Sequence, residues 1–193
     1  ALLEQGFSPV AVGVDGRISA LFGVGDPLRP ESRMFIERLK TLGLEPIILS
    51  GDHPDVVAAI ARRLGIDEAS AKGGVSPEGK HVFVDELMER REGRIAMVGD
   101  GVNDAAALQA ADIGIAVNGG AEASLVAADV FTTRQGLEPV WELVEGSREV
   151  VSVVKRNLRM SAGYNAVAVL AAAVGLIGPL IAAFAMPASS IAV

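Results

Sequence analysis

Residues 95–108 read Ile-Ala-Met-Val-Gly-Asp-Gly-Val-Asn-Asp-Ala-Ala-Ala-Leu, and this stretch decides the fold. Its apolar start, residues 95–98, is typical of a buried parallel strand. The glycines on either side of Asp100 permit a tight turn and a close approach of a ligand. Asn103 or Asp104 then begins a helix as its N-cap. Because ligands bind at the carboxyl ends of strands in open α/β sheets, this turn is a candidate site.

Asp100 and Asp104 place two carboxylates four residues apart at this strand end. At a separation of about 4 Å, such carboxylates repel by roughly 4 kcal/mol if the effective dielectric constant is near 20. A bound cation would relieve the repulsion, and Mg²⁺ commonly combines one or two carboxylates with phosphate oxygens. The pattern therefore predicts a magnesium site. The alternative is an aspartate turn followed by an aspartate cap.

The composition excludes some kinds of function. The chain has 193 residues, 50% of them hydrophobic, and a formal charge of −7, so a nucleic-acid partner is not expected. It has no cysteine, which excludes thiolate metal sites and a cysteine nucleophile within this stretch. Residues 160–193 contain no charged residue or histidine. Because this run exceeds the roughly 20 residues of one membrane span, we expect two transmembrane helices, over 160–177 and a truncated one over 180–193, in a piece of a larger membrane protein.

Strand and helix signals alternate along the rest of the chain. Asp15-Gly16 separates two β-rich runs, which predicts a hairpin over residues 8–24. The expected helices cover residues 31–42, 54–64, 77–91 and 121–128, and the expected strands cover 46–49, 113–117 and 130–132. Residues 69–75 are compatible with a short strand. This alternation predicts an α/β fold with a doubly wound parallel sheet.

A long amphipathic helix is expected over residues 137–159, because apolar and charged residues alternate there at spacings of three and four. It ends in Lys155, Arg156 and Arg159, just before the uncharged run. Basic residues beside a membrane span mark the cytoplasmic side. Everything before Met160 is therefore expected to be cytoplasmic.

Further polar groups lie where the sheet meets its helices. Ser50-Gly51-Asp52 joins an expected strand to a helix start, which is a natural anion site. Lys80 lies in the first turn of its helix, against the helix dipole, and a solvated surface lysine is the alternative. A hydroxyl and a lysine can hold phosphoryl oxygens while carboxylates hold Mg²⁺. These parts suit phosphoryl transfer, but a nucleophile is missing, because the residues after Asp15 do not fit the pattern of haloacid-dehalogenase-type enzymes.

The order of these motifs resembles the C-terminal part of P-type ATPases of the heavy-metal-transporting branch. Asp26-Pro27-Leu28-Arg29 resembles the hinge Asp-Pro-x-Arg, and Ser50-Gly51-Asp52 resembles Thr-Gly-Asp with serine in place of threonine. Pro77-Glu78-Gly79-Lys80 resembles Pro-x-x-Lys, and residues 99–104 resemble the Mg²⁺-binding Gly-Asp-Gly-x-Asn-Asp. The family's phosphorylated aspartate, in Asp-Lys-Thr-Gly-Thr, is expected upstream, so this stretch alone should not hydrolyse ATP.

The resemblance implies a role for each matched residue. Asp100 would coordinate Mg²⁺ directly, and Asp104 and Asn103 would support the metal and the phosphate. Ser50 and Lys80 would contact the aspartyl phosphate. The residues implied in placing ATP are Asp26, Arg29, Gly51 and Asp52. The implied domains are the end of a nucleotide-binding domain over 1–24, a phosphorylation domain over 25–136 and a linker helix over 137–159.

The uncharged run indicates the transported ion. Tyr164-Asn165 and Met186-Pro187-Ala188-Ser189-Ser190 resemble the Tyr-Asn and Met-x-Ser-Ser pairs of the copper(I)-transporting subgroup. Thioether sulfur suits Cu(I), and the run holds no carboxylate of the kind that the zinc and calcium branches would use. The implied ligands of Cu⁺, with Ag⁺ as a further candidate, are Tyr164, Asn165, Met186 and Ser190. The alternatives are that Met186 fills space and that Tyr164 anchors the interface.

The sequence is thus interpreted as part of an ATP-driven copper pump in a bilayer, with a bacterial-type plasma membrane and delivery by a copper chaperone as further expectations. One alternative is a membrane-anchored haloacid-dehalogenase-type phosphatase. Another is a non-catalytic fragment that regulates or binds a partner.

Overall fold

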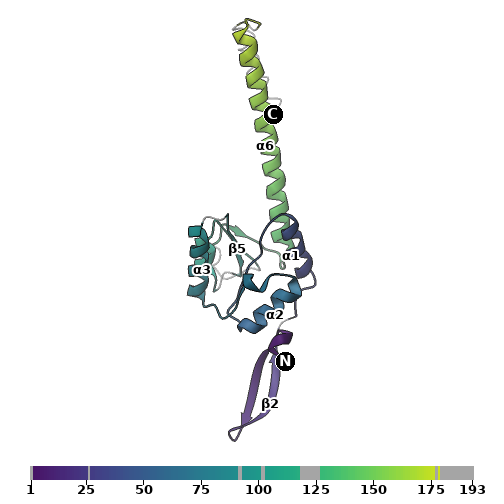
Figure 1. Ribbon diagram of the computed structural model, residues 1–193, viewed down its shortest axis with the longest axis vertical. Coiled ribbons are helices and arrows are strands. Elements are labelled where there is room, and N and C mark those ends of the chain that lie inside the picture. The colour runs from purple at the N-terminus through teal and green to yellow at the C-terminus, as the bar shows by residue number, and fades with distance from the viewer. Residues whose placement is uncertain are drawn as a thin grey trace. The chain divides into compact units, whose positions relative to one another are not determined.

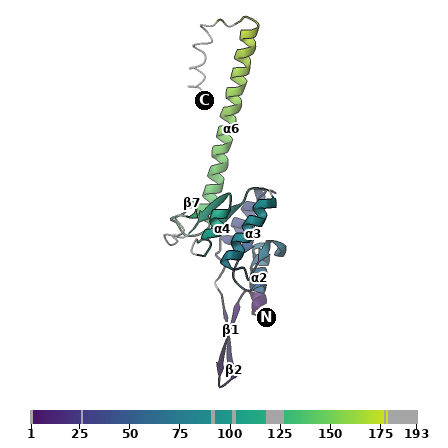
Figure 2. The same ribbon diagram turned by 90° about the vertical axis from the view of Figure 1, so that its left-hand side faces the viewer.

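The computed structural model describes residues 2–25, 27–90, 93–100, 103–117, 127–176 and 178. The chain divides into two compact units, Ala1–Trp141 and Glu142–Val193. In the first unit, helices lie around short strands, and Figure 1 and Figure 2 show this α/β arrangement from two sides.

The expected hairpin is confirmed. It follows a short 3-10 helix, η1 (Leu3–Gln5), and consists of strands β1 (Ser8–Val14) and β2 (Arg17–Val24), which pair antiparallel. Asp15 and Gly16 both have positive φ angles, +52° and +74°, as a two-residue turn of this kind requires. Apolar side chains of both strands are exposed in this chain. The side chain of Ile18, for example, is 76% exposed.

The parallel strands follow the expected order, but the described ones form two sheets. Strand β3 (Ile48–Leu49) pairs with β4 (Ala71–Lys72). Strands β5 (Ala96–Gly99), β6 (Ile113–Ala116) and β7 (Val130–Phe131) form the second sheet in that order, again parallel. The prediction of a parallel α/β fold is confirmed, whereas a single continuous sheet is not seen among the described residues.

Strand β5 departs from the sequence prediction in two ways. It begins at Ala96 and includes Gly99, so it lies one residue later than the expected range of 95–98. It is also not buried, as the 37% exposure of Val98 shows. The physical reason is that the described part of the chain pairs β5 on one side only, with β6.

The helices of the first unit agree closely with the prediction. They are α1 (Ser32–Thr41), α2 (Pro54–Leu64), α3 (Pro77–Arg90) and α4 (Ala105–Ala110), with a 3-10 turn η2 (Glu68–Ser70). Helix α2 matches to the residue, because the His53 imidazole accepts a hydrogen bond from the Asp55 amide at its start and Gly65, with φ +72°, ends it. The helix expected over 121–128 falls mostly outside the described residues.

Two apolar clusters hold the first unit together. Helix α2 contributes Ala61 and Leu64, which lie with Ile66 against side chains of the residues before α1, of α1 itself and of β3. Helix α4 contributes Ala107 and Leu108, both fully buried, next to the buried Ile115 and Ala116 of β6. The second cluster therefore supports the strand end at which the candidate site lies.

Asp112 fastens the start of β5 to β6. One carboxylate oxygen accepts a hydrogen bond from the Ile95 amide at 2.9 Å, and the other lies 2.5 Å from the Arg94 guanidinium. Both partners lower the pKa of Asp112 below its ordinary value of 3.8, and the hydrogen bond from the Ile95 amide has a larger effect than Arg94. Since the negative carboxylate is the form that these partners favour, Asp112 stabilises the fold when it is ionised.

This lowered pKa predicts a pH dependence of stability. A carboxyl group with a depressed folded-state pKa contributes stability above its unfolded pKa, and that contribution is lost as the pH falls through the folded pKa. The difference in unfolding free energy between the wild type and Asp112→Asn should be constant from pH 7 to pH 5 and should shrink below about pH 4. Urea unfolding of both proteins at several pH values measures it. A difference that persists unchanged at pH 2.5 would contradict the assignment.

Helix α6 (Glu138–Ala173) begins in the first unit and continues into the second. It starts one residue after the expected position and runs without a break beyond residue 159. Apolar side chains of its later turns are exposed, among them Leu158, Val167 and Leu170 at 67–68%.

The described part of the chain contains no helix with the length and apolarity needed to span a bilayer. The uncharged part of α6 covers only residues 160–173, which is shorter than the roughly 20 residues of a span. The helix expected over 160–177 is therefore not confirmed. The one expected over 180–193 lies outside the described residues.

Candidate functional site

Helix α3 is built to present Lys80 in its first turn. The Ser76 hydroxyl accepts a hydrogen bond from the Gly79 amide at 3.0 Å, which is the geometry of an N-cap, and Pro77 occupies the first helical position. Ser76 is not among the residues predicted for the site. A signal for it exists in the sequence, because serine directly before a proline commonly caps a helix.

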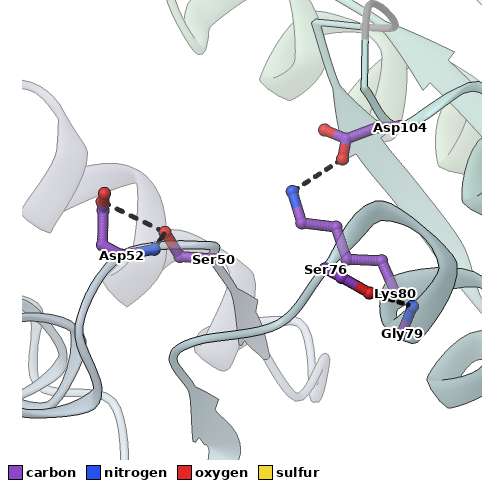
Figure 3. Close-up of polar contacts among 6 residues, drawn as sticks. All are labelled: Ser50, Asp52, Ser76, Gly79, Lys80 and Asp104. Carbon is purple, nitrogen blue, oxygen red and sulfur yellow. Dashed lines mark hydrogen bonds and ion pairs between the residues drawn. The ribbon is translucent and has the colours of Figure 1, made fainter.

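Lys80 forms an ion pair with Asp104. Its Nζ atom lies 2.7 Å from Asp104 Oδ1, and the two side chains are only 14% and 12% exposed (Figure 3). Lys80 is therefore not a solvated surface lysine. The carboxylate compensates a cation that would otherwise lie unfavourably at the positive end of α3. Helices α3 and α4 lie side by side (Figure 2), which brings together residues that are 24 positions apart.

Asp104 occupies the N-cap position of α4, as the sequence predicted for Asn103 or Asp104. Its side chain makes no capping hydrogen bond and points instead to Lys80. The backbone still begins the helix, since the Leu108 amide donates to the Asp104 carbonyl at 2.8 Å. The carboxylate is thus used for the pair with Lys80 rather than for the helix end.

Gly99 makes this close arrangement sterically feasible. A Cβ atom at this position would lie 2.7 Å from Asp104 Oδ2, which is closer than real contacts allow, and 3.0 Å from Asp104 Cβ, which is a tight contact. A larger residue at position 99 would therefore force the Asp104 side chain to move away from the strand end. Asp100 follows directly and is exposed, as is Asn103.

The donors at this strand end fit Mg²⁺. Asp100 and Asp104 offer oxygen ligands, Gly99 leaves space beside the Asp104 carboxylate, and Asn103 can add a carbonyl oxygen. The described residues contain no group of three or more acidic, histidine or cysteine side chains arranged to hold a metal ion. A small number of carboxylates is what Mg²⁺ uses when phosphate and water complete its ligands.

Ser50 and Asp52 form a second polar pair. The Ser50 hydroxyl donates to Asp52 Oδ2 at 3.1 Å and accepts from the Asp52 amide at 3.2 Å. The same turn is held by the segment after β4, because the Val75 amide donates to the Ser50 carbonyl at 3.0 Å. Since Ser76 follows directly and caps α3, this segment connects the Ser50 turn to the helix that carries Lys80. Figure 3 shows the two polar pairs as separate groups.

The remaining predicted site residues are placed only in part. Arg29 and Gly51 are exposed, and Asp26 lies outside the described residues. Tyr164 and Asn165 lie on α6 and are exposed, Tyr164 at 41%. Met186 and Ser190 lie outside the described residues, so the expected set of four copper ligands stays a prediction.

The sequence of the first unit matches a known protein family. Residues 1–112 match the model of the haloacid dehalogenase-like hydrolases. The chain belongs to this family.

More particular similarities extend over nearly the whole chain. The chain is 35% identical over 189 residues to a copper-exporting P-type ATPase of Staphylococcus haemolyticus, and this match covers 98% of the chain. It is 38% identical over 193 residues to a copper-exporting P-type ATPase of Bacillus subtilis, and this match covers 100% of the chain. It spans only about a quarter of the length of these relatives, 23% and 24%.

The chain also resembles solved structures of ATPases. A zinc-transporting PIB-type ATPase in the E2.Pi state matches with a TM-score of 0.82 and 31% identity over 98% of this chain and 31% of that one. The catalytic domain of a CPx-ATPase, studied upon nucleotide binding, matches with a TM-score of 0.58 and 35% identity over 69% of this chain and 52% of that one.

Proposed function

We propose that this chain is the phosphorylation region of a P-type ATPase that moves Cu⁺ across a membrane at the expense of ATP. The observation that carries the proposal is the Lys80–Asp104 pair beside Asp100, at the carboxyl end of a parallel strand. The similarity to copper-exporting P-type ATPases over the whole chain supports it. As a hydrolase-family domain alone, the chain would also suit a phosphatase, which remains the second candidate.

In this proposal the chain's own side chains hold the phosphoryl group. Lys80 Nζ and Ser50 Oγ donate hydrogen bonds to phosphoryl oxygens, and Asp100, Asp104 and Asn103 hold Mg²⁺. Mg²⁺, when bound, supplies positive charge that stabilises the transferred phosphoryl group. Since Asp104 also fixes the Lys80 ammonium, the lysine is oriented before the phosphate arrives.

The arrangement of strands supports a nucleophile contributed by polypeptide beyond these 193 residues. Within the described residues, β3 pairs only with β4, and β5 pairs on one side with β6. Each therefore keeps a strand edge with unpaired backbone groups, which proteins normally cover. A further parallel strand ending in the phosphorylated aspartate would pair with these edges and cover exposed side chains such as Val98.

The rest of the chain would have supporting roles. Residues 1–24 would end a nucleotide-binding domain, whose remainder would cover the exposed hairpin, and Asp26, Arg29, Gly51 and Asp52 would help to place ATP at the hinge. Residues 25–136 would form the phosphorylation domain, and the helix over 137–159 would lead to membrane helices over 160–177 and 180–193. Lys155, Arg156 and Arg159 would mark the cytoplasmic side of a bacterial-type plasma membrane.

The identity of the transported ion is the more specific part of the proposal. Tyr164, Asn165, Met186 and Ser190 would contribute to a Cu⁺ site that also suits Ag⁺, fed by a copper chaperone. A solved relative is described as zinc-transporting, so Zn²⁺ is the competing ion. Measuring which ion stimulates ATP hydrolysis by the longer protein separates the two.

The decisive experiment is phosphoenzyme formation by the longer protein that carries this chain. Incubation with γ-labelled ATP and Mg²⁺ should give an acid-stable, hydroxylamine-labile phosphoprotein, because acyl phosphates react with hydroxylamine. Asp100→Asn should abolish it. A protein that hydrolyses small phosphate esters, without phosphoenzyme from ATP and without ion stimulation, would support the phosphatase instead.

Ser50→Ala gives a milder expected result in the same protein. It removes the hydroxyl that we place on the phosphoryl group but leaves Lys80 and the carboxylates, so phosphoenzyme turnover should slow by roughly tenfold, the effect of about one hydrogen bond to a charged group. Ser50→Thr keeps the hydroxyl and should restore turnover. Unchanged turnover in Ser50→Ala would remove Ser50 from the site.

A further inference from the structure

Arg38 joins two helices that are far apart in the sequence. Its guanidinium carbon lies 5.2 Å from the centre of the Trp141 ring, and its Nη1 atom lies 3.7 Å from Glu138 Oε2. Arg38 belongs to α1, whereas Glu138 and Trp141 belong to the first turn of α6, and Figure 1 shows the two helices side by side at this point. Both distances lie within the range of the corresponding interactions.

A second contact ties the same two regions together just before α6. Gly136 has a φ of +96°, and a Cβ atom at this position would lie 3.5 Å from Glu31 Oε1 and 3.7 Å from Arg29 Nη1. The segment that enters α6 therefore passes close to the residues that precede α1. Within the first turn, Val140 is 2% exposed, so the start of α6 is anchored in the first unit.

We propose that Arg38 is a positioning residue that fastens the start of α6 to α1, so that movement of the hinge segment is passed to α6. The inference rests on the proposed function, in which α6 leads toward the membrane. Helix α1 begins three residues after Arg29, and the Ser32 amide donates to the Arg29 carbonyl at 3.0 Å, so a movement of the hinge segment would also move α1. The contacts of Arg38 with Trp141 and Glu138 then carry the first turn of α6 along.

The exposure of this contact suits a coupling role better than a purely stabilising one. The Arg38 side chain is 38% exposed and Glu138 is 57% exposed, so solvent weakens the ion pair. A cation over an aromatic ring at such a site favours the state in which α1 and the start of α6 are in contact by a factor of roughly two to five. Loss of Arg38 should therefore alter how often the two helices are joined, without unfolding the first unit.

The first test uses this chain and its single tryptophan, Trp141. Arg38→Ala should shift the Trp141 emission to longer wavelength and raise its quenching by acrylamide, because the guanidinium no longer covers the ring. Arg38→Lys should keep most of the protection. The matched control is Arg33→Ala, which removes an arginine of the same helix that pairs with Glu37 at 3.0 Å within α1. Equal quenching in Arg38→Ala and the wild type would overturn the inference.

The second test uses the longer protein reconstituted into vesicles and measures ions transported per phosphate released. Arg38→Ala should lower this ratio by roughly two- to fivefold with an unchanged phosphoenzyme level, whereas Arg33→Ala should not change it. Transport and hydrolysis falling in parallel would show a merely structural role and overturn the proposal. An unchanged ratio in a pumping protein refutes only the role of Arg38, while a wild type that forms no phosphoenzyme refutes the proposed function and this inference with it.

Discussion

Lys80→Met is expected to lower both the activity of the longer protein and the stability of this chain. The substitution removes an ammonium that we place on the phosphoryl group, and loss of one preorganised donor commonly costs about 10²–10³-fold in rate. Phosphoenzyme formation should fall by this factor. Rapid-quench measurement with labelled ATP checks it, and a fall of less than tenfold would contradict the assigned role.

The stability effect arises because Asp104 loses its partner. With only 12% of its side chain exposed, the carboxylate is largely removed from water, and breaking a buried pair typically costs 3–5 kcal/mol. Since solvent still reaches both groups, we expect about 2 kcal/mol, a fall in Tm of roughly 4–8 °C. Thermal unfolding followed by circular dichroism measures this shift.

Two variants separate the effects of Lys80→Met. Lys72→Met changes an exposed lysine of β4 and should leave both Tm and phosphoenzyme formation unchanged. The double variant Lys80→Met with Asp104→Asn removes both charges, so it should recover part of the stability without recovering activity. If Lys80→Met alone unfolds at the wild-type temperature, the pair does not hold the two helices together in solution.

The local signals in the sequence predicted most elements of the first unit, because they act within a few residues. Helix α2 was predicted to the residue from a proline start and a glycine stop. The turn at Asp15-Gly16 likewise depends only on two residues that tolerate positive φ. Strand β5 was misjudged as buried, since burial depends on which strands lie beside it, and periodicity does not contain that information.

The candidate site was predictable in its residues but not in its contacts. Gly99, Asp100 and Asp104 stand out through their spacing, and their position at a strand end follows from the α/β pattern. The pairing of Lys80 with Asp104 required the packing of α3 on α4, which no short-range signal specifies. The same holds for Arg38 and Trp141, whose contact depends on how the chain returns after β7.

Gly114→Ala is expected to cause the largest loss of stability among the single substitutions considered. A Cβ atom at position 114 would lie 2.5 Å from the Leu108 carbonyl oxygen and 3.2 Å from Leu108 Cβ. The first neighbour is helix backbone, and Leu108 is fully buried, so neither group can yield without moving α4. Overpacking of this kind costs about 3 kcal/mol. We expect a fall in Tm of roughly 6–12 °C.

The same substitution should also disturb the candidate site. Leu108 lies one turn after Asp104 in α4, so displacing Leu108 from β6 moves the carboxylate that pairs with Lys80. Gly146→Ala is the matched control, because nothing lies within 4 Å of its Cβ position and alanine favours a helix interior by roughly 0.5–1 kcal/mol over glycine. It should leave Tm unchanged or raise it slightly. If Gly114→Ala unfolds within 2 °C of the wild type, the close approach of α4 to β6 is not present in solution, and the support that it gives to the Lys80–Asp104 pair must come from elsewhere.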